Sequence, residues 1–340
     1  MSPLPPGAPL GLYLHVPFCG HVCPYCDFNT YAGQEALIPR YVAALERDVA
    51  TQGRALGGRE AGTMFFGGGT PSLLPAELVG RLVRACREAF AVAANAEVTL
   101  EANPNSVDEA YFAGLREAGV NRLSVGVQTL HRRGLRVLGR QHEGADAEAA
   151  VRAARAAGFD NVSLDLIFGW PGQKLADWRC DLETVLGWDG APEHLSLYSL
   201  IVEPGTPMAD AVARGILTVP DDDATADLYE AAMELLGQAG WVHYEVANWA
   251  RGDEADGRTG GQADSRESSV VSRQSQELSP QSSILSPNSS VRLSACPPVL
   301  TRPDTPTAGC RSPPGTRAPD TDSRSRRTSR RRRRTGAGCR

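Results

Sequence analysis

The chain has 340 residues, of which 41% are hydrophobic and 22% charged, and this is enough to build a sizeable core in one large domain or two modest ones. No run of about 18 apolar residues occurs, and residues 1–10 have neither the charged nor the apolar part of a signal peptide. These features predict a cytoplasmic protein without a membrane span, and they predict that residues 1–10, which are rich in Pro and Gly, form a flexible N-terminus.

Short β-rich runs alternate with longer amphipathic segments from residue 11 to about residue 250. The runs that predict strands are Leu12–Val16, Thr63–Phe66, Glu97–Glu101, Arg122–Val127, Val162–Ile167 and His194–Leu200. The segments that predict helices are 35–53, 75–91, 107–118, 145–157, 174–187 and 223–239. Six such units predict an α/β fold with a parallel sheet and outer helices, either doubly wound or a partial barrel. In both architectures, the site lies at the carboxyl ends of the strands.

The end of the chain differs in composition from the rest. The net charge of −5 hides an asymmetry, because arginines crowd the segment from Arg324 to Arg334 whereas the part before Arg251 is acidic. Ser, Arg, Pro, Gly and Thr dominate residues 253–340, which contain no aromatic residue, and we predict a disordered, low-complexity tail there. Arginine runs attract phosphate, but without interleaved aromatic residues we expect no specific binding of nucleic acid.

Three of the eight cysteines, Cys19, Cys23 and Cys26, form a C-x3-C-x2-C loop directly after the first predicted strand. Thiolates are soft ligands that suit an iron–sulfur cluster or zinc. A structural zinc site needs four ligands, so His15 or His21 would have to supply the fourth. A 4Fe–4S cluster on three thiolates leaves one iron open to a chelating ligand, and the spacing favours this cluster over zinc or plain reduced cysteines.

Seven ordered segments between residues 11 and 250 match the pattern of a known family. They are Leu12–Cys19, Cys23–Phe28, Gly67–Ser72, Leu100–Pro104, Ser124–Gln128, Leu138–His142 and Asp165–Gly172. In these segments the chain resembles the radical S-adenosylmethionine (SAM) family, in the branch of the HemW-type heme chaperones and the oxygen-independent coproporphyrinogen III oxidases. The resemblance implies a partial, TIM-like α6β6 barrel over residues 11–252, with a 4Fe–4S cluster on the three cysteines and SAM at its open iron.

The Gly-rich turn after the second predicted strand is the first candidate SAM contact. Glycines let backbone groups approach a ligand closely, and the start of the following helix favours an anion. By itself such a turn is as often only a tight turn. With the resemblance, we expect Gly68, Gly69 and Thr70 to contact the methionyl part of SAM.

Polar residues at the ends of later strands complete the predicted SAM site. Glu101, Gln128 and Asp165 end the third, fourth and fifth strands, and any one of them alone is an ordinary polar residue at a strand end. Carboxylates and an amide suit the amino group and ribose hydroxyls of SAM, and Arg140 suits its carboxylate. The resemblance adds two tyrosines beside the cofactor, Tyr13 and Tyr25.

Two features separate the two activities of this branch. The oxidases carry a further cysteine two positions after Cys26, where this chain has Phe28, and they have a long N-terminal arm for which the first strand here leaves no room. Both features favour a heme chaperone, which binds heme as cargo and passes it to an acceptor protein. Neither the acceptor nor the electron donor can be identified from the sequence. The alternative is the oxidase, a radical SAM decarboxylase of coproporphyrinogen III.

The family pattern stops near Ala250. Family members continue with a His-Asn-x-x-Tyr-Trp segment, thought to contribute a heme ligand, and a C-terminal domain, whereas His243 is the last histidine here. The composition of residues 253–340 is that expected of a GC-rich gene translated out of frame. We therefore predict a frameshift near Arg251 that replaces the domain, with a genuine disordered appendage as the alternative.

Overall fold

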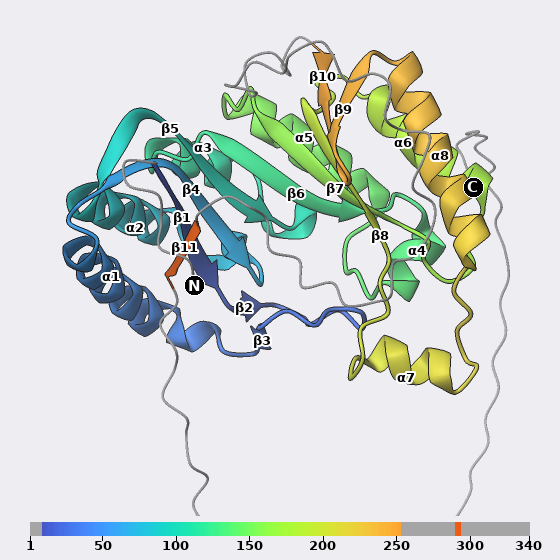
Figure 1. The fold of residues 1–340 in the computed structure, drawn as a ribbon, viewed down its shortest axis with the longest axis horizontal. Coiled ribbons are helices and arrows are strands. Elements are labelled where there is room, and N and C mark those ends of the chain that lie inside the picture. Colours follow the sequence, from blue (N-terminus) through green and yellow to red (C-terminus); the bar gives the residue numbers. More distant parts are fainter. Residues whose placement is uncertain (1–8, 253–289, 294–340) are drawn as a thin grey trace, which may run out of the picture. The chain divides into compact units, whose positions relative to one another are not determined.

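The computed structural model describes residues 9–252 and 290–293, and six parallel strands form the centre of its main sheet (Figure 1). In chain order and in spatial order, these strands are β1 (Leu10–Val16), β4 (Glu60–Gly68), β5 (Ala91–Ala102), β6 (Arg122–Gln128), β7 (Val162–Phe168) and β8 (His194–Ser199). The longer helices are α1 (Ile38–Ala55), α2 (Ala76–Ala89), α3 (Glu109–Glu117), α5 (Gly144–Ala156), α6 (Leu175–Leu186) and α8 (Asp222–Gln238). The predicted α/β class is confirmed, and this open strand order is consistent with the predicted partial barrel.

Strands and helices form where the sequence concentrates apolar residues. In β1, the alternate residues Leu10, Leu12, Leu14 and Val16 are buried in the core, as expected for a strand with one face against helices. In β7, every residue except Asp165 is buried, which is typical of a parallel strand covered on both faces. The polar exceptions therefore mark positions where a strand faces something other than the core.

Shorter elements lie between the central strands and long helices, and of these the sequence analysis predicted only η1, as the start of the helical segment 35–53. They are the helices α4 (Arg132–Val137) and α7 (Pro207–Ala213), the 3-10 turns η1 (Glu35–Leu37), η2 (Pro71–Leu73) and η3 (Pro104–Ser106), and the strands β9 (Trp241–Glu245) and β10 (Asn248–Arg251). The antiparallel pair β10 and β9 extends the sheet beyond β8. A second small sheet pairs β2 (Phe18–Cys19) with β3 (Tyr31–Ala32) and closes the base of the cysteine loop.

A further strand, β11 (Ser290–Leu293), pairs in parallel with β1 at the other edge of the sheet. It lies within the segment predicted to be a disordered tail. Two physical reasons favour pairing: the free edge of β1 offers unpaired backbone N–H and C=O groups, and Ser-Val-Arg-Leu alternates polar and apolar residues. Residues 1–8, 253–289 and 294–340, on which the remaining predictions for the two ends of the chain fall, lie outside the described residues. None of the described helices is both long and apolar enough to span a lipid bilayer.

Candidate functional site

The cysteine loop, residues 19–30, follows β2 and carries the three predicted metal ligands. Its base is held by the β2–β3 pairing and by the Tyr31 backbone N–H, which donates to the Pro17 carbonyl at 2.7 Å. All three thiols, Cys19, Cys23 and Cys26, are free, with Cys19 buried and the other two half-buried. They line one pocket of about 390 Å³ at the carboxyl ends of the parallel strands.

The surroundings of the thiols show how close they lie to one another. Burial raises the pKa of Cys26, and the nearby Cys23 and Cys19 thiolates raise it further. The Thr70 hydroxyl donates to Cys19 Sγ at 3.6 Å, and Arg140 Nη1 donates to Cys23 Sγ at 3.8 Å. Within the described parts of the chain, no group of three or more His, Cys, Asp or Glu side chains is arranged to hold a single metal ion. The three thiols are thus neighbours in a pocket that also supplies donors to their sulfur atoms.

The Gly-rich turn at the end of β4 packs directly against the cysteine loop. Gly68 has a φ of 122°, and its N–H donates to Glu101 Oε2 at 3.1 Å. A Cβ atom on Gly69 would lie 2.5 Å from the Phe18 carbonyl oxygen, so only glycine fits there. The Thr70 N–H donates to the same carbonyl at 2.7 Å. The structure therefore places all three predicted residues, Gly68 to Thr70, on the wall of the pocket.

Three polar residues at strand ends line the same pocket, as predicted: Glu101, Gln128 and Asp165. Burial raises the pKa of Glu101 to about 7, and the charge of Asp165 adds to the shift. Burial also raises the pKa of Asp165, although the Ser124 hydroxyl donates to both of its carboxylate oxygens at 3.1 Å. Gln128 has a φ of 66°, the one positive value among the described non-glycine residues. A strained backbone and two desolvated carboxyl groups are typical of a ligand site.

Arg140 is the cation of the pocket. Its Nη2 donates to Asn103 Oδ1 at 2.6 Å and to the Gly126 carbonyl at 2.7 Å. Its buried Nε has no hydrogen-bond partner among the described residues, so one donor is left for a ligand. The sequence analysis did not identify Asn103 as a site residue, although it lies in the matched segment Leu100–Pro104 and follows the end of a strand.

The two predicted tyrosines have different places. Tyr25 lines the pocket and packs on a small apolar cluster that includes Leu138 and Met208. Tyr13 is not among the described residues that line the pocket; its ring stacks on Phe65 with centroids 6.0 Å apart, and its hydroxyl lies 3.4 Å from His15 Nδ1. The structure therefore brings Tyr25, but not Tyr13, to the predicted site.

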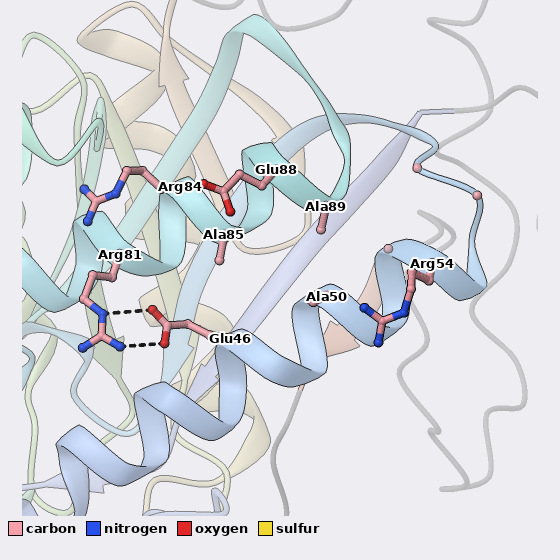
Figure 2. A pocket seen from close by; sticks show the side chains of 11 residues that line it. Glu46, Ala50, Arg54, Arg81, Arg84, Ala85, Glu88 and Ala89 are labelled. Atoms are coloured by element: carbon pink, nitrogen blue, oxygen red, sulfur yellow. Dashed lines mark hydrogen bonds and ion pairs between the residues drawn. The ribbon is translucent and has the colours of Figure 1, made fainter.

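A larger cavity of about 730 Å³ lies elsewhere, between α1 and α2 (Figure 2). Across it, Arg81 of α2 and Glu46 of α1 form a two-pronged ion pair with distances of 2.9 and 2.6 Å. The two helices approach closely where Gly53 meets Ala89. None of the predicted site residues lines this groove. The smaller pocket beside the cysteine loop is the candidate functional site.

Comparisons with known proteins agree with this geometry. A family model of the Radical SAM superfamily matches residues 13–184. The chain therefore belongs to the radical SAM superfamily.

Similarity to individual proteins assigns the chain to a narrower family within this superfamily. It is 42% identical over 254 residues to the heme chaperone HemW of Mycobacterium tuberculosis, a match that covers 74% of this chain and 64% of the relative. It is 39% identical over 245 residues to HemW of Escherichia coli, with coverage of 72% and 63%. Within the superfamily the chain is a member of the HemW-type family, as the sequence analysis predicted, and it spans less than two thirds of these relatives.

Among solved structures, the chain is similar to coproporphyrinogen III oxidase (HemN) from Escherichia coli, a radical SAM enzyme. The identity is 29%, the TM-score is 0.65, and the match covers 72% of this chain and 56% of that one.

Proposed function

We propose that this chain is the radical SAM part of a HemW-type heme chaperone, which binds a 4Fe–4S cluster and SAM and passes heme to an acceptor protein. One observation carries the proposal: three free thiols line the same pocket as two desolvated carboxyl groups and a half-buried guanidinium. The names of the 42% and 39% identical relatives supply the heme part of the proposal.

The donor set fits a 4Fe–4S cluster. Cys19, Cys23 and Cys26 offer three thiolates, which leaves one iron of such a cluster open to another ligand. When bound, the cluster supplies an electron at low potential and an open coordination site. Thr70 and Arg140 would donate to two of the cysteine sulfurs, and donors of this kind stabilise bound thiolates and tune the cluster.

The inner wall of the pocket suits SAM, which carries an ammonium group, a carboxylate and a sulfonium. Glu101 would accept a hydrogen bond from the ammonium group of SAM. The Nε of Arg140, which has no partner among the described residues, would donate to the SAM carboxylate. Asp165, oriented by Ser124, and the Gln128 amide would bind the ribose hydroxyls. The ammonium group and the carboxylate of SAM thus each have an opposite charge on this wall.

The test is anaerobic reconstitution of the full chain with iron and sulfide, followed by titration with SAM and with heme. We expect about four irons per chain and saturable binding of SAM. We expect heme to bind weakly and to pass to apomyoglobin, used as a general heme acceptor, because we predict that a frameshift near Arg251 replaces the segment that contributes a heme ligand. A chain that retains no cluster, or that releases no heme to apomyoglobin, would contradict the proposal.

The second candidate is the coproporphyrinogen III oxidase reaction, which the fold similarity to HemN favours. Phe28 stands at the position of the additional oxidase cysteine and points against it. Incubating the reconstituted chain with SAM, a reductant and coproporphyrinogen III separates the two functions, because only the oxidase converts this substrate to its decarboxylated product.

A further inference from the structure

The two lateral edges of the main sheet differ in how their sequences suit an edge. Among the described strands, β9 forms one edge and ends in the charged residue Glu245, whereas β11 forms the other edge beside β1. Without β11, the edge strand would be β1, whose seven residues include no Asp, Glu, Lys, Arg or Pro. Charged residues and prolines are what normally keep an edge strand from pairing with another segment. By its sequence, the outer edge of β1 is therefore open to strand addition.

The structure places a strand on this edge. β11 pairs in parallel with the first half of β1, and the register sets Val291 beside Leu12 and Leu293 beside Leu14. Leu12 and Leu14 are buried in the core of the sheet. Figure 1 shows β11 alongside β1, where it also lies next to α1. The added strand thus continues the apolar row of β1 with two further apolar residues.

The sequence of the tail explains why this segment fits the edge. Residues 289–294, Ser-Ser-Val-Arg-Leu-Ser, alternate polar and apolar residues, which is the pattern of a strand with one face on a core. Pro287 and Pro297 flank the segment, and because proline lacks the N–H of a strand, an added strand is confined to the residues between them. In such pairing the main chain supplies affinity and alternate side chains supply specificity. The edge therefore suits a short extended segment with apolar residues two positions apart.

We propose that the outer edge of β1 is a strand-acceptor site for an extended peptide segment, and that the tail of this chain fills the site through β11. The inference goes beyond the proposed heme function and does not depend on it. A segment of a partner protein with the same alternation would compete with β11, and in the parallel register it would run toward the end of the sheet that carries the candidate site. Because β11 is tethered to the edge that it covers, its effective concentration is high, and the unaltered chain is closed to such a partner.

Hydrogen exchange tests whether β11 covers the edge. Val291→Pro in the full chain should free the edge, because proline removes a backbone donor and cannot continue a strand. The peptide that covers residues 11–14 should then exchange its outward-facing amides at least about tenfold faster. The matched control Ala308→Pro, in the same tail but outside the paired segment, should exchange as the unaltered chain does. All of these proteins should give the same circular dichroism spectrum, since the central strands are unchanged.

A labelled peptide tests whether the free edge accepts a strand. The peptide has the sequence of residues 288–295 and carries fluorescein at its N-terminus. Fluorescence anisotropy should show that it binds the Val291→Pro chain at least about tenfold more tightly than the unaltered chain, in which the tethered β11 competes. The same peptide with proline in place of both its valine and its leucine should bind neither protein, because it lacks the donors and the apolar residues of the strand.

Different results would overturn different parts of the inference. Equal exchange of residues 11–14 in the Val291→Pro and unaltered chains would show that β11 does not cover the edge. Peptide binding that is absent from both proteins, or equal in both, would show that the edge is not an acceptor. If sedimentation showed that Val291→Pro converts a dimer to a monomer, the tail would fill the edge of a second copy and the assignment to its own chain would be wrong. None of these results bears on iron content or SAM binding, which test the proposed function separately.

Discussion

Asp181 is a buried carboxyl group that contacts the residues directly after the strained Gln128. Replacing Asp181 tests whether these contacts fix the conformation of Gln128. Asp181 lies on α6 and is 3% exposed. It accepts hydrogen bonds from the Thr129 hydroxyl and from the Leu130 N–H, the latter at 3.2 Å. The Thr129 N–H also donates back to the Val127 carbonyl at 2.8 Å, so Gln128 sits at the centre of a three-residue turn. We expect Asp181 to position the Gln128 amide in the pocket without touching the ligand.

The hydrogen bonds of Asp181 determine how much stability its replacement should cost. Asp181→Ala leaves two buried donors without an acceptor, and each such loss costs about 1–3 kcal/mol, so the free energy of unfolding should fall by about 2–6 kcal/mol. Asp181→Asn keeps one acceptor oxygen and should lose roughly half as much. Both variants should bind SAM more weakly while retaining the cluster, because the thiols lie on a different loop.

The pH dependence of stability isolates the carboxyl group. Burial raises the pKa of Asp181 from 3.8 to about 7. Between these values the folded chain keeps a proton that the unfolded chain releases, so the stability contributed by this group is complete below about pH 4 and is lost as the pH rises to 7. A shift of about three pKa units is worth about 4 kcal/mol, of which roughly 3 kcal/mol falls between pH 5 and pH 8.

Urea denaturation at pH 5 and pH 8 measures this loss. Glu101 and Asp165 also have raised pKa values, so the informative quantity is the difference between the unaltered chain and Asp181→Asn. The unaltered chain should lose more stability from pH 5 to pH 8 than the asparagine variant. Equal losses in the two proteins would refute the reasoning, as would an alanine variant that is as stable as the unaltered chain.

Three other predictions concern the pocket directly. Replacing any of the three cysteines of the cysteine loop by Ala should abolish cluster reconstitution, measured as iron per chain, whereas Cys86→Ala, in the core between α2 and the sheet, should retain it. The SAM affinity should tighten by about tenfold from pH 6 to pH 8, because Glu101, with a pKa of about 7, must lose its proton to pair with an ammonium group; Glu101→Gln should show no such change. Gly69→Ala should lower the free energy of unfolding by about 1–3 kcal/mol through its clash with a backbone carbonyl. The matched change Gly20→Ala, where a Cβ meets nothing within 4 Å, should alter it by less than about 0.5 kcal/mol.

The sequence predicted the central strands and long helices to within a few residues, because the apolar periodicity of these elements extends over many residues. The exceptions are β4 and β5, which begin earlier than predicted. It did not predict α4 or α7, since a helix of six or seven residues is too short to show a helical period. Strands β9 and β10 were also missed because most residues of β9 are exposed and carry no alternating pattern. The cysteines could be placed from their spacing, and the strand-end polar residues from the predicted topology together with the family resemblance. The position of Tyr13 could not, because a tyrosine on a strand looks the same whether it faces a ligand or packs on Phe65.

The charges of the inner pocket explain why it suits a ligand that carries positive charge. Asp165 raises the pKa of Glu101, and both carboxyl groups are removed from bulk water, so each one disfavours ionisation of the other. Arg140 only partly offsets this, because its guanidinium is shared among Asn103, the Gly126 carbonyl and a cysteine sulfur. A bound cation would let both carboxyl groups ionise, and the free energy regained would add to its affinity.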